Sequence, residues 1–274
     1  MTRPMNLQSR VAIVTGAASG IGRAIAVSLA RRSCALALAD IDEDGLAETK
    51  RLASVGAEKI TLHRLDVADR KAVAAFPRVV FEAYGRADLL VNNAGVALGG
   101  TFEQLSEEDF EWLFEINFWG VVRMTRAFLP LLKASDDARI VNLSSLFGLI
   151  APAGQTAYAA SKFAVRGFSN ALMQELEPSP VGVTVVHPGG VATAIADRSR
   201  APKSATPEEV AAALARAKAM LRLAPEVAGE TIVKGIERRQ RRILVGGDAK
   251  AIAAIERLAP VSYPPILARL MRDP

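Results

Sequence analysis

A glycine-rich segment between an apolar run and a helical pattern is the feature that most constrains this chain. Residues 11–15 are apolar or β-branched, residues 16–22 read Gly-Ala-Ala-Ser-Gly-Ile-Gly, and a helical pattern begins at about residue 21. A turn of this kind between a strand and a helix lets the backbone approach a pyrophosphate, whose charge the helix N-terminus stabilises. The G-x-x-x-G-x-G spacing departs from the common G-x-G-x-x-G pattern. The prediction of a dinucleotide site therefore rests on the position of the glycines after a strand, and not on their spacing.

Similar apolar runs recur along the chain and alternate with longer helical patterns. This alternation predicts βαβ units, and therefore a single α/β domain with a doubly wound parallel sheet of about seven strands, the Rossmann fold. Strands that are buried on both faces are continuous apolar runs, as most of these are. The predicted strands are 11–15, 35–39, 60–65, 89–92, 140–143, 183–186 and 242–245. The predicted helices lie near 21–32, 43–55, 69–84, 107–133, 157–177, 207–221 and 226–239, and Pro77 is expected to kink or divide the third of them.

Composition excludes several classes of protein. Half of the 274 residues are apolar, which is enough to bury a sizeable core and excludes intrinsic disorder. Cys34 is the only cysteine, so no internal disulfide can form, and with His63 and His187 alone the usual Cys/His zinc sites cannot be assembled. We therefore expect no metal. No apolar stretch has the length of a signal peptide or a membrane span, so we expect a cytoplasmic protein.

The positive charge of the chain is confined to one region. The formal net charge is +5, and residues 231–274 hold nine Lys/Arg and four Asp/Glu, so residues 1–230 are neutral. Binding to nucleic acid needs a broad positive surface. A basic C-terminal region on a neutral body therefore predicts no nucleic-acid partner.

Asp40 ends the predicted second strand, where an acidic side chain can accept hydrogen bonds from an adenosine ribose. A carboxylate there would repel a 2′-phosphate, and Ser19 offers no positive charge to bind one. Both residues favour NAD over NADP. The alternative is that Asp40 caps the helix that follows residues 41–43.

Tyr158 and Lys162 form a Y-x-x-x-K pair in a predicted helix. Residues four apart share a helix face, so the two side chains are neighbours. A phenol is a poor base at neutral pH, but a nearby ammonium group favours the phenolate and moves the phenol pKa toward the range where acid–base catalysis is efficient. The pair therefore predicts a proton-transfer site.

Further motifs make this interpretation specific. Ser145 lies thirteen residues before Tyr158, and residues 92–95 read Asn-Asn-Ala-Gly. With these motifs the chain resembles the short-chain dehydrogenase/reductase family from residue 10 to about residue 195. Asp66-Val67, Asn117 and residues 188–193 also fit the family pattern. The resemblance implies an oxidoreductase that transfers hydride between NAD(H) and a secondary alcohol or ketone.

The resemblance also implies a role for each catalytic residue. Tyr158 would exchange a proton with the substrate oxygen, and Ser145 would hydrogen-bond that oxygen as it gains charge. Lys162 would lower the pKa of the tyrosine and hold the nicotinamide ribose, and Asn117 would anchor a water that links Lys162 to solvent. The expected cofactor-binding residues are Gly16, Ala18, Ser19, Gly20, Ile21, Gly22, Asp40, Asp66, Val67, Asn93, Ala94, Gly95, Tyr158, Lys162, Pro188, Gly189, Val191 and Thr193.

Other functions compete with this prediction. An NADP-dependent carbonyl or 3-oxoacyl reductase is the alternative within the enzyme class, and a nucleotide-binding protein without catalysis is the alternative outside it. A serine hydrolase is excluded because no G-x-S-x-G motif surrounds Ser144 or Ser145. His187, which directly precedes a proline, is better explained as a strand-terminal residue, and His63 as a core or sheet-edge histidine.

Two segments are expected to determine the substrate. Residues 147–154 are apolar, and residues 194–206 combine small residues with three cations and resemble a mobile lid. Together with residues 96–98, they predict a pocket for an apolar secondary alcohol or ketone. The same aliphatic residues would also suit an ordinary core.

The last 27 residues extend beyond the family pattern. We expect residues 1–247 to form the Rossmann-fold and catalytic domain, and residues 248–274 a helical C-terminal extension of the same domain. Ile252, Ile255 and Leu258 are spaced for one helix face, and prolines interrupt the pattern before residues 266–271. The extension would pack over the substrate pocket, form a subunit contact, or lie on an anionic membrane surface. The helices near 117–133 and 157–177 match those that pair subunits in the family, which implies a homodimer or homotetramer.

Overall fold

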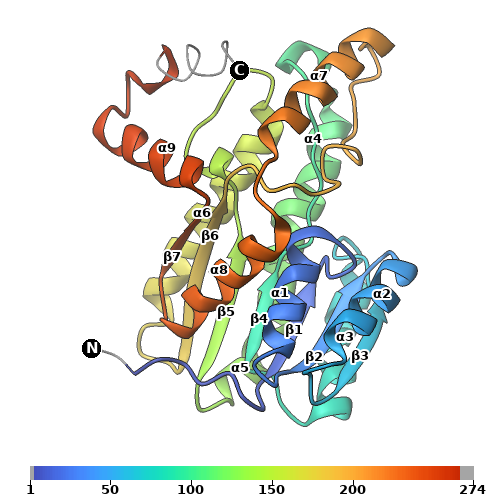
Figure 1. The fold of residues 1–274 in the computed structure, drawn as a ribbon, viewed down its shortest axis with the longest axis vertical. Coiled ribbons are helices and arrows are strands. Elements are labelled where there is room, and N and C mark those ends of the chain that lie inside the picture. The colour runs from blue at the N-terminus through green and yellow to red at the C-terminus, as the bar shows by residue number, and fades with distance from the viewer. Residues whose placement is uncertain (1–2, 266–274) are drawn as a thin grey trace.

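A seven-stranded parallel sheet forms the centre of the computed structural model, which describes residues 3–265 (Figure 1). Its strand order is β3-β2-β1-β4-β5-β6-β7, and every neighbouring pair is parallel. The strands are β1 (Val11–Thr15), β2 (Ala35–Asp40), β3 (Ile60–Arg64), β4 (Leu89–Asn92), β5 (Ala138–Leu143), β6 (Val181–Pro188) and β7 (Arg242–Val245). The predicted doubly wound Rossmann fold in a single domain is therefore confirmed.

Helices cover both faces of this sheet. One layer holds α1 (Gly20–Ala30), α2 (Glu43–Ala53) and α8 (Pro225–Glu237), and the other holds α3 (Arg70–Tyr84), α5 (Gly120–Lys133) and α6 (Thr156–Glu175). Successive strand residues point to opposite faces. Val14 accordingly packs in the first layer and Ile13 in the second, and both are fully buried. This double burial explains why the strands are continuous apolar runs in the sequence.

The helix predicted over residues 107–133 is interrupted. The structure has α4 (Glu107–Phe114), a π-helical segment η2 (Glu115–Trp119) and then α5, with the Gly120 N–H donating to the Glu115 carbonyl. The wider turn brings Asn117 to the interior, where its side chain is fully buried. Short π-helical segments of this kind are frequent at functional sites. The chain is therefore helical throughout the predicted residues 107–133, and the change of hydrogen bonding over Glu115–Trp119 was not predicted.

Pro77, which was expected to kink or divide α3, does not divide it. The helix continues from Arg70 to Tyr84 through the proline. Proline removes one backbone hydrogen bond, but α3 buries Val73, Phe76 and Val80 against the core. Packing of this apolar face stabilises the helix more than one missing hydrogen bond weakens it.

Three helices stand beyond the carboxyl ends of the strands: α4, α7 (Pro207–Met220) and α9 (Gly247–Leu258) (Figure 1). In α9 the buried residues are Ala249 and Ala253, whereas Leu258 is 85% exposed, so the predicted apolar face is only partly buried. The predicted segment 266–271 lies outside the described residues. No helix within residues 3–265 is both long enough and apolar enough to cross a membrane.

Candidate active site

The turn between β1 and α1 has a shape that only glycine allows at three positions. Gly16 and Gly20 have φ angles of +64° and +53°, in the left-handed region that glycine adopts without strain. A Cβ atom on Gly22 would lie 2.1 Å from the carbonyl oxygen of Gly16. The turn is therefore closely packed on itself and against Asn93, and it leads directly into the N-terminus of α1. This geometry fits the pyrophosphate of a dinucleotide.

The loop after β4 is fixed to this turn by hydrogen bonds. The Asn93 side-chain amide donates to the carbonyls of Thr15 and Gly16, both at 3.0 Å. The Thr15 hydroxyl accepts from the backbone N–H groups of Asn93 at 3.0 Å and Ala94 at 3.1 Å. Asn93, expected to contact a cofactor, thus has its side-chain amide committed to holding two loops together.

Asp40 lies at the end of β2, as predicted, next to the glycine-rich turn. Its carboxylate accepts from the N–H of Ala18 at 3.0 Å and from the N–H of Asp42 at 3.1 Å. The residue that caps α2 is Asp42, which accepts from the N–H of Gly45 at 2.9 Å. The alternative interpretation of Asp40 as the helix cap was therefore wrong.

Asp66 and Val67 follow β3 near the same end of the sheet. Asp66 is exposed and accepts from the N–H of Ala68 at 2.8 Å. Val67 is buried against Gly120, where a Cβ atom would approach the valine methyl group to 2.8 Å.

Ser145, Tyr158 and Lys162 come together beyond the carboxyl end of β5. Ser145 follows this strand, and α6 presents Tyr158 and Lys162 on one face. The Lys162 Nζ lies 5.7 Å from the centre of the Tyr158 ring and donates to the Leu143 carbonyl at 3.2 Å. The Ser144 hydroxyl donates to the Lys162 carbonyl at 2.8 Å, so it supports α6 and faces away from this cluster.

Burial governs the titration of both groups on α6. It raises the pKa of the Tyr158 phenol, and a hydrogen bond with the Ser145 side chain partly opposes this shift. Burial lowers the pKa of Lys162 to about 8, because the charged ammonium is disfavoured away from water. The pKa of the Tyr158 phenol is therefore raised in the chain itself, and not lowered as expected from the neighbouring Lys162.

Asn117 and Gly95 form the opposite wall of this cluster. The Asn117 side chain accepts from the Val96 N–H at 2.9 Å and donates to the Val96 carbonyl at 3.0 Å. A Cβ atom on Gly95 would lie 3.0 Å from the Asn117 Oδ1 and 3.5 Å from the Lys162 Nζ. The π-helical segment thus holds the loop after β4 closely against Lys162.

The loop after β6 contains a contact that the sequence analysis missed. The Asp248 carboxylate, in the first turn of α9, accepts from the Gly190 N–H at 2.7 Å. A Cβ atom on Gly189 would approach the same carboxylate to 2.2 Å. Val191 is buried, and the Thr193 side chain faces Gly20 of the glycine-rich turn. The position of Asp248 after two glycines was the only signal in the sequence.

The segment 194–206 is anchored to α4. The Arg200 guanidinium lies 3.7 Å from the centre of the Trp112 ring and 3.4 Å from the Asp109 carboxylate, and the Arg200 N–H donates to the Ala97 carbonyl at 3.1 Å. Arg198 reaches the carboxylate of Asp42 at 3.5 Å. The segment therefore extends from α4 to the start of α2, close to the end of β2.

The second predicted substrate segment meets the C-terminal extension. The 3-10 turn η3 (Leu146–Gly148) overlaps the start of this segment, residues 147–154, and Leu149 and Ile150 are buried. The Ala151 N–H donates to the Tyr263 hydroxyl at 3.3 Å. The part of the chain after Gly247 thus contacts residues that follow the Ser145 turn.

Comparison with known proteins agrees with this geometry. Residues 10–204 match the short chain dehydrogenase family. SadH of Mycobacterium tuberculosis, a protein named as an oxidoreductase, is 44% identical over 265 residues, which cover 96% of this chain and 95% of SadH. The chain belongs to the short-chain dehydrogenase/reductase family, whose members are NAD(P)-dependent oxidoreductases that act on alcohol or carbonyl groups.

Solved structures support the same assignment. A short-chain dehydrogenase/reductase from Burkholderia phymatum in complex with NAD superposes with a TM-score of 0.86 at 33% identity, covering 95% of this chain and 97% of that one. An alcohol dehydrogenase from Thermococcus sibiricus complexed with 5-hydroxy-NADP has a TM-score of 0.72 at 28% identity, covering 87% of this chain and 95% of that one.

Within residues 3–265, no group of three His, Cys, Asp or Glu side chains is placed to hold a metal ion.

His187 makes the site sensitive to acid. Its Nδ1 lies 2.9 Å from the Ser145 carbonyl and its Nε2 is buried without a partner, so burial lowers the imidazole pKa to about 4. The unfolded chain then binds a proton between about pH 6.5 and pH 4 that the folded chain does not, and stability falls as the pH falls through this window. We expect His187→Asn to remove about 3 kcal/mol of this pH dependence, measured by denaturant unfolding at pH 7 and pH 4.5.

His63 provides the matched control. It is half-buried in the edge strand β3, and burial lowers its pKa without the very large desolvation of His187. His63→Asn should change the pH dependence less than His187→Asn. Equal effects of the two substitutions would contradict the assignment of the acid sensitivity to His187.

Proposed function

We propose that this chain is an NAD-dependent oxidoreductase that interconverts an apolar secondary alcohol and its ketone through Tyr158, Ser145, Lys162 and Asn117. The observation that carries the proposal is the meeting of Ser145 and Tyr158, whose side chains lie close together beside the buried ammonium of Lys162. The three side chains lie at the carboxyl edge of the sheet, the side on which α/β folds bind ligands.

The dinucleotide fits the residues present, because the positive φ angles of Gly16 and Gly20 shape a turn that leads directly into the N-terminus of α1. The nicotinamide ring of the bound cofactor supplies or accepts the hydride. Gly16, Gly20 and Gly22 would let the backbone approach the pyrophosphate, and Asp40 would accept hydrogen bonds from the adenosine ribose.

Tyr158 holds the proton that is exchanged with the substrate oxygen, and Ser145 donates a hydrogen bond to that oxygen as negative charge develops. Burial keeps the phenol protonated, which suits donation to a ketone. For alcohol oxidation the phenolate must form, and the positive charges of Lys162 and of the oxidised cofactor favour it.

Lys162 connects the phenol to solvent in this proposal. The lowered pKa, about 8, allows Lys162 to gain or lose a proton near neutral pH. Asn117 would place a water beside the ammonium. The Asn117 side-chain amide is hydrogen-bonded to the Val96 backbone. The more direct role of Asn117 is therefore to hold the loop after β4 against Lys162.

An apolar substrate is supported by the side chains around Tyr158. A cluster of buried residues that includes Leu98, Leu105 and Leu113 packs with Tyr158, and Leu149 and Ile150 are buried in the segment after Ser145. The hydrogen bond between Ala151 and Tyr263 places the C-terminal extension beside that segment. We propose that the extension covers the substrate pocket.

Use of NADP is the alternative, and one contact favours it. Arg198 lies beside Asp42, two residues beyond Asp40, and offers a positive charge near the end of β2. A 2′-phosphate would still have to approach the Asp40 carboxylate. We therefore retain NAD as the proposed cofactor. The lack of a nearby positive charge no longer supports this choice, because Arg198 supplies one.

Substitution of Tyr158 tests the reaction. With a panel of secondary alcohols and NAD, followed at 340 nm, Tyr158→Phe should lower kcat by about a hundredfold to ten-thousandfold, because the proton donor is lost. Ser145→Ala should lower kcat by about a hundredfold or more. Ser144→Ala is the matched control, and it should reduce stability much more than turnover. Turnover that survives Tyr158→Phe would refute the mechanism.

Asp40→Ala tests the choice of cofactor. Loss of the carboxylate removes both the ribose partner and the repulsion of a 2′-phosphate, so KM for NAD should rise and KM for NADP should fall, each by about tenfold. The two KM values, measured with one alcohol, give the result. An unchanged preference would remove Asp40 from the determinants of specificity.

We also propose a cytoplasmic homodimer or homotetramer that pairs through α5 and α6. Trp119, next to the start of α5, and Phe163 on α6 are 45% and 37% exposed, and exposed aromatic side chains of this kind are typical of protein interfaces. Light scattering coupled to size exclusion should give a mass above that of one chain. A monomer at all concentrations would contradict this assembly.

A further inference from the structure

A groove on the outer edge of the sheet collects much of the basic charge of the C-terminal region. It has a volume of about 300 Å³ and lies along β7, between α8 and the start of α9. Nine residues line it, and four of these are Lys or Arg: Lys234, Arg238, Arg242 and Lys250. No carboxylate is among the lining residues, and Thr231 and Gln240 supply neutral polar groups.

The cations of this groove are largely unneutralised. Lys234 pairs with Glu230 at 3.3 Å. Within residues 3–265, Arg238, Arg242 and Lys250 form no salt bridge. The neighbouring Arg239 and Arg241 differ, because each pairs with a carboxylate, at Asp137 and Glu177 respectively.

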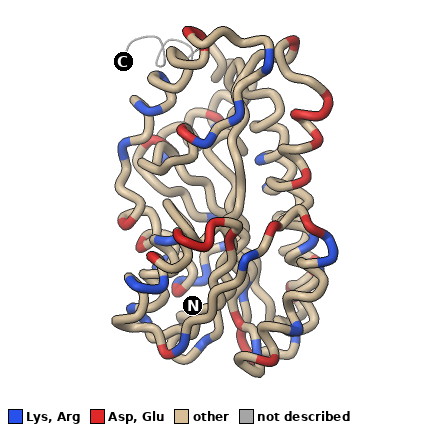
Figure 2. The backbone as a smooth tube through the Cα atoms, turned by 90° about the vertical axis from the view of Figure 1, so that its right-hand side faces the viewer, with Lys and Arg blue, Asp and Glu red and all other residues tan. Residues whose placement is uncertain are grey.

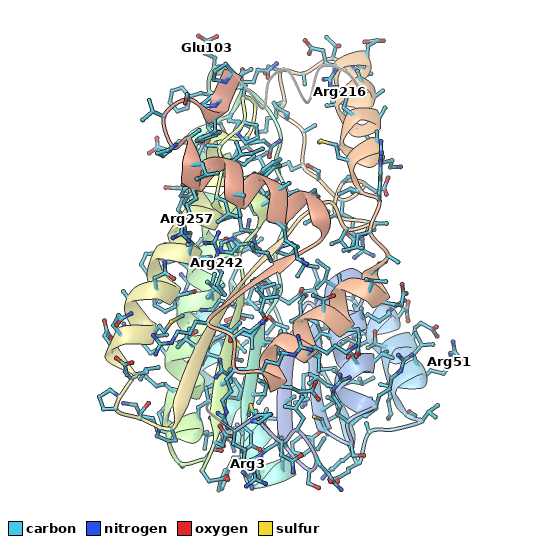
Figure 3. All side chains as sticks on the ribbon, turned by 60° about the vertical axis from the view of Figure 1, so that its left-hand side comes forward. Arg3, Arg51, Glu103, Arg216, Arg242 and Arg257 are labelled. Carbon is cyan, nitrogen blue, oxygen red and sulfur yellow. The ribbon has the colours of Figure 1, made fainter. Side chains whose placement is uncertain are left out.

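Arg242 is also affected by charges on two neighbouring helices. Burial lowers the pKa of Arg242, and the positive charges of Arg166 on α6 and Arg257 on α9 lower it further, while Glu256 opposes them. Arg242 and Arg257 lie on the same side of the molecule, whereas Arg216 on α7 lies well away from them (Figure 3). Elsewhere on the chain, positive and negative residues are interspersed (Figure 2).

Such a concentration of like charge disfavours a second copy of this chain at this edge. An edge strand offers unpaired backbone groups for pairing with another strand. Pairing of β7 with its own copy would, however, bring the arginines of both copies together, and like charges across an interface are destabilising. The groove is instead complementary to an anion.

We propose that this groove is a binding site for a phosphate-bearing anion. Arginine and lysine bind phosphate through charge-assisted hydrogen bonds, and arginine can donate two such bonds to one phosphate. The groove is large enough for a small phosphorylated molecule or for the headgroup of an anionic phospholipid. Leu258 and Val261, 85% and 89% exposed at the end of α9, would contact the apolar part of a lipid.

The test uses inorganic pyrophosphate and the full-length chain at low ionic strength. Isothermal titration calorimetry should detect binding to the unmodified protein, with NAD absent and with NAD saturating. The double substitution Arg238→Gln/Arg242→Gln should weaken binding by about tenfold or more. Arg216→Gln, which removes an exposed charge outside the groove, should change the affinity less than twofold, and both variants should unfold at the same temperature as the parent protein.

Three results would overturn the proposal. The first is the absence of pyrophosphate binding at roughly millimolar concentration. The second is a loss of affinity in Arg216→Gln equal to that in the double substitution. The third is displacement of pyrophosphate by NAD, with no effect of the double substitution on pyrophosphate binding. The last result would assign the binding to the glycine-rich turn.

Vesicles identify the source of the phosphate. Phosphatidylcholine vesicles with and without phosphatidylglycerol are tested by co-sedimentation. Binding that requires phosphatidylglycerol and is lost in Arg238→Gln/Arg242→Gln would support a lipid headgroup. Binding of pyrophosphate without co-sedimentation would support a free phosphorylated ligand.

Discussion

The hydrogen bonds that join the loop after β4 to the turn after β1 are the constraint on which the site depends. The strand order reverses between β1 and β4, so the loops that follow these strands diverge and leave a crevice. Asn93 and Thr15 bridge the start of this crevice. Gly95 and Val96 follow this bridge in the chain. Gly95 lies close to Lys162, and Val96 is hydrogen-bonded to Asn117 of the π-helical segment. The bridge therefore positions the glycine-rich turn, Lys162 and the π-helical segment relative to one another.

The sequence predicted the sheet well because its strands are buried on both faces, which makes each one a short apolar run. Only the strand ends differ, and β5 and β6 begin two residues earlier than predicted. Helix periodicity was less informative near Asn117. A single wider turn leaves the apolar pattern of residues 107–133 nearly intact, so the pattern gave no sign that the helix changes its hydrogen bonding there.

The predicted site residues that are close in sequence, such as Tyr158 and Lys162, could be placed from helix spacing alone. Contacts between distant segments could not. Asp248 reaches the loop after β6 and Arg200 stacks on Trp112, yet none of these residues stands out in its local sequence. The titration of Tyr158 also depends on burial, which raises its pKa, and a pattern of residues does not contain that information.

The bond between Asp248 and the loop after β6 makes two distant positions interdependent. A side chain at Gly189 would displace the Asp248 carboxylate, and loss of that carboxylate would leave the Gly190 N–H without its partner. A chain that keeps α9 with this aspartate therefore has no room for a side chain at the position of Gly189. The start of the C-terminal extension is thus coupled to the loop after β6, and the two should have changed together during evolution.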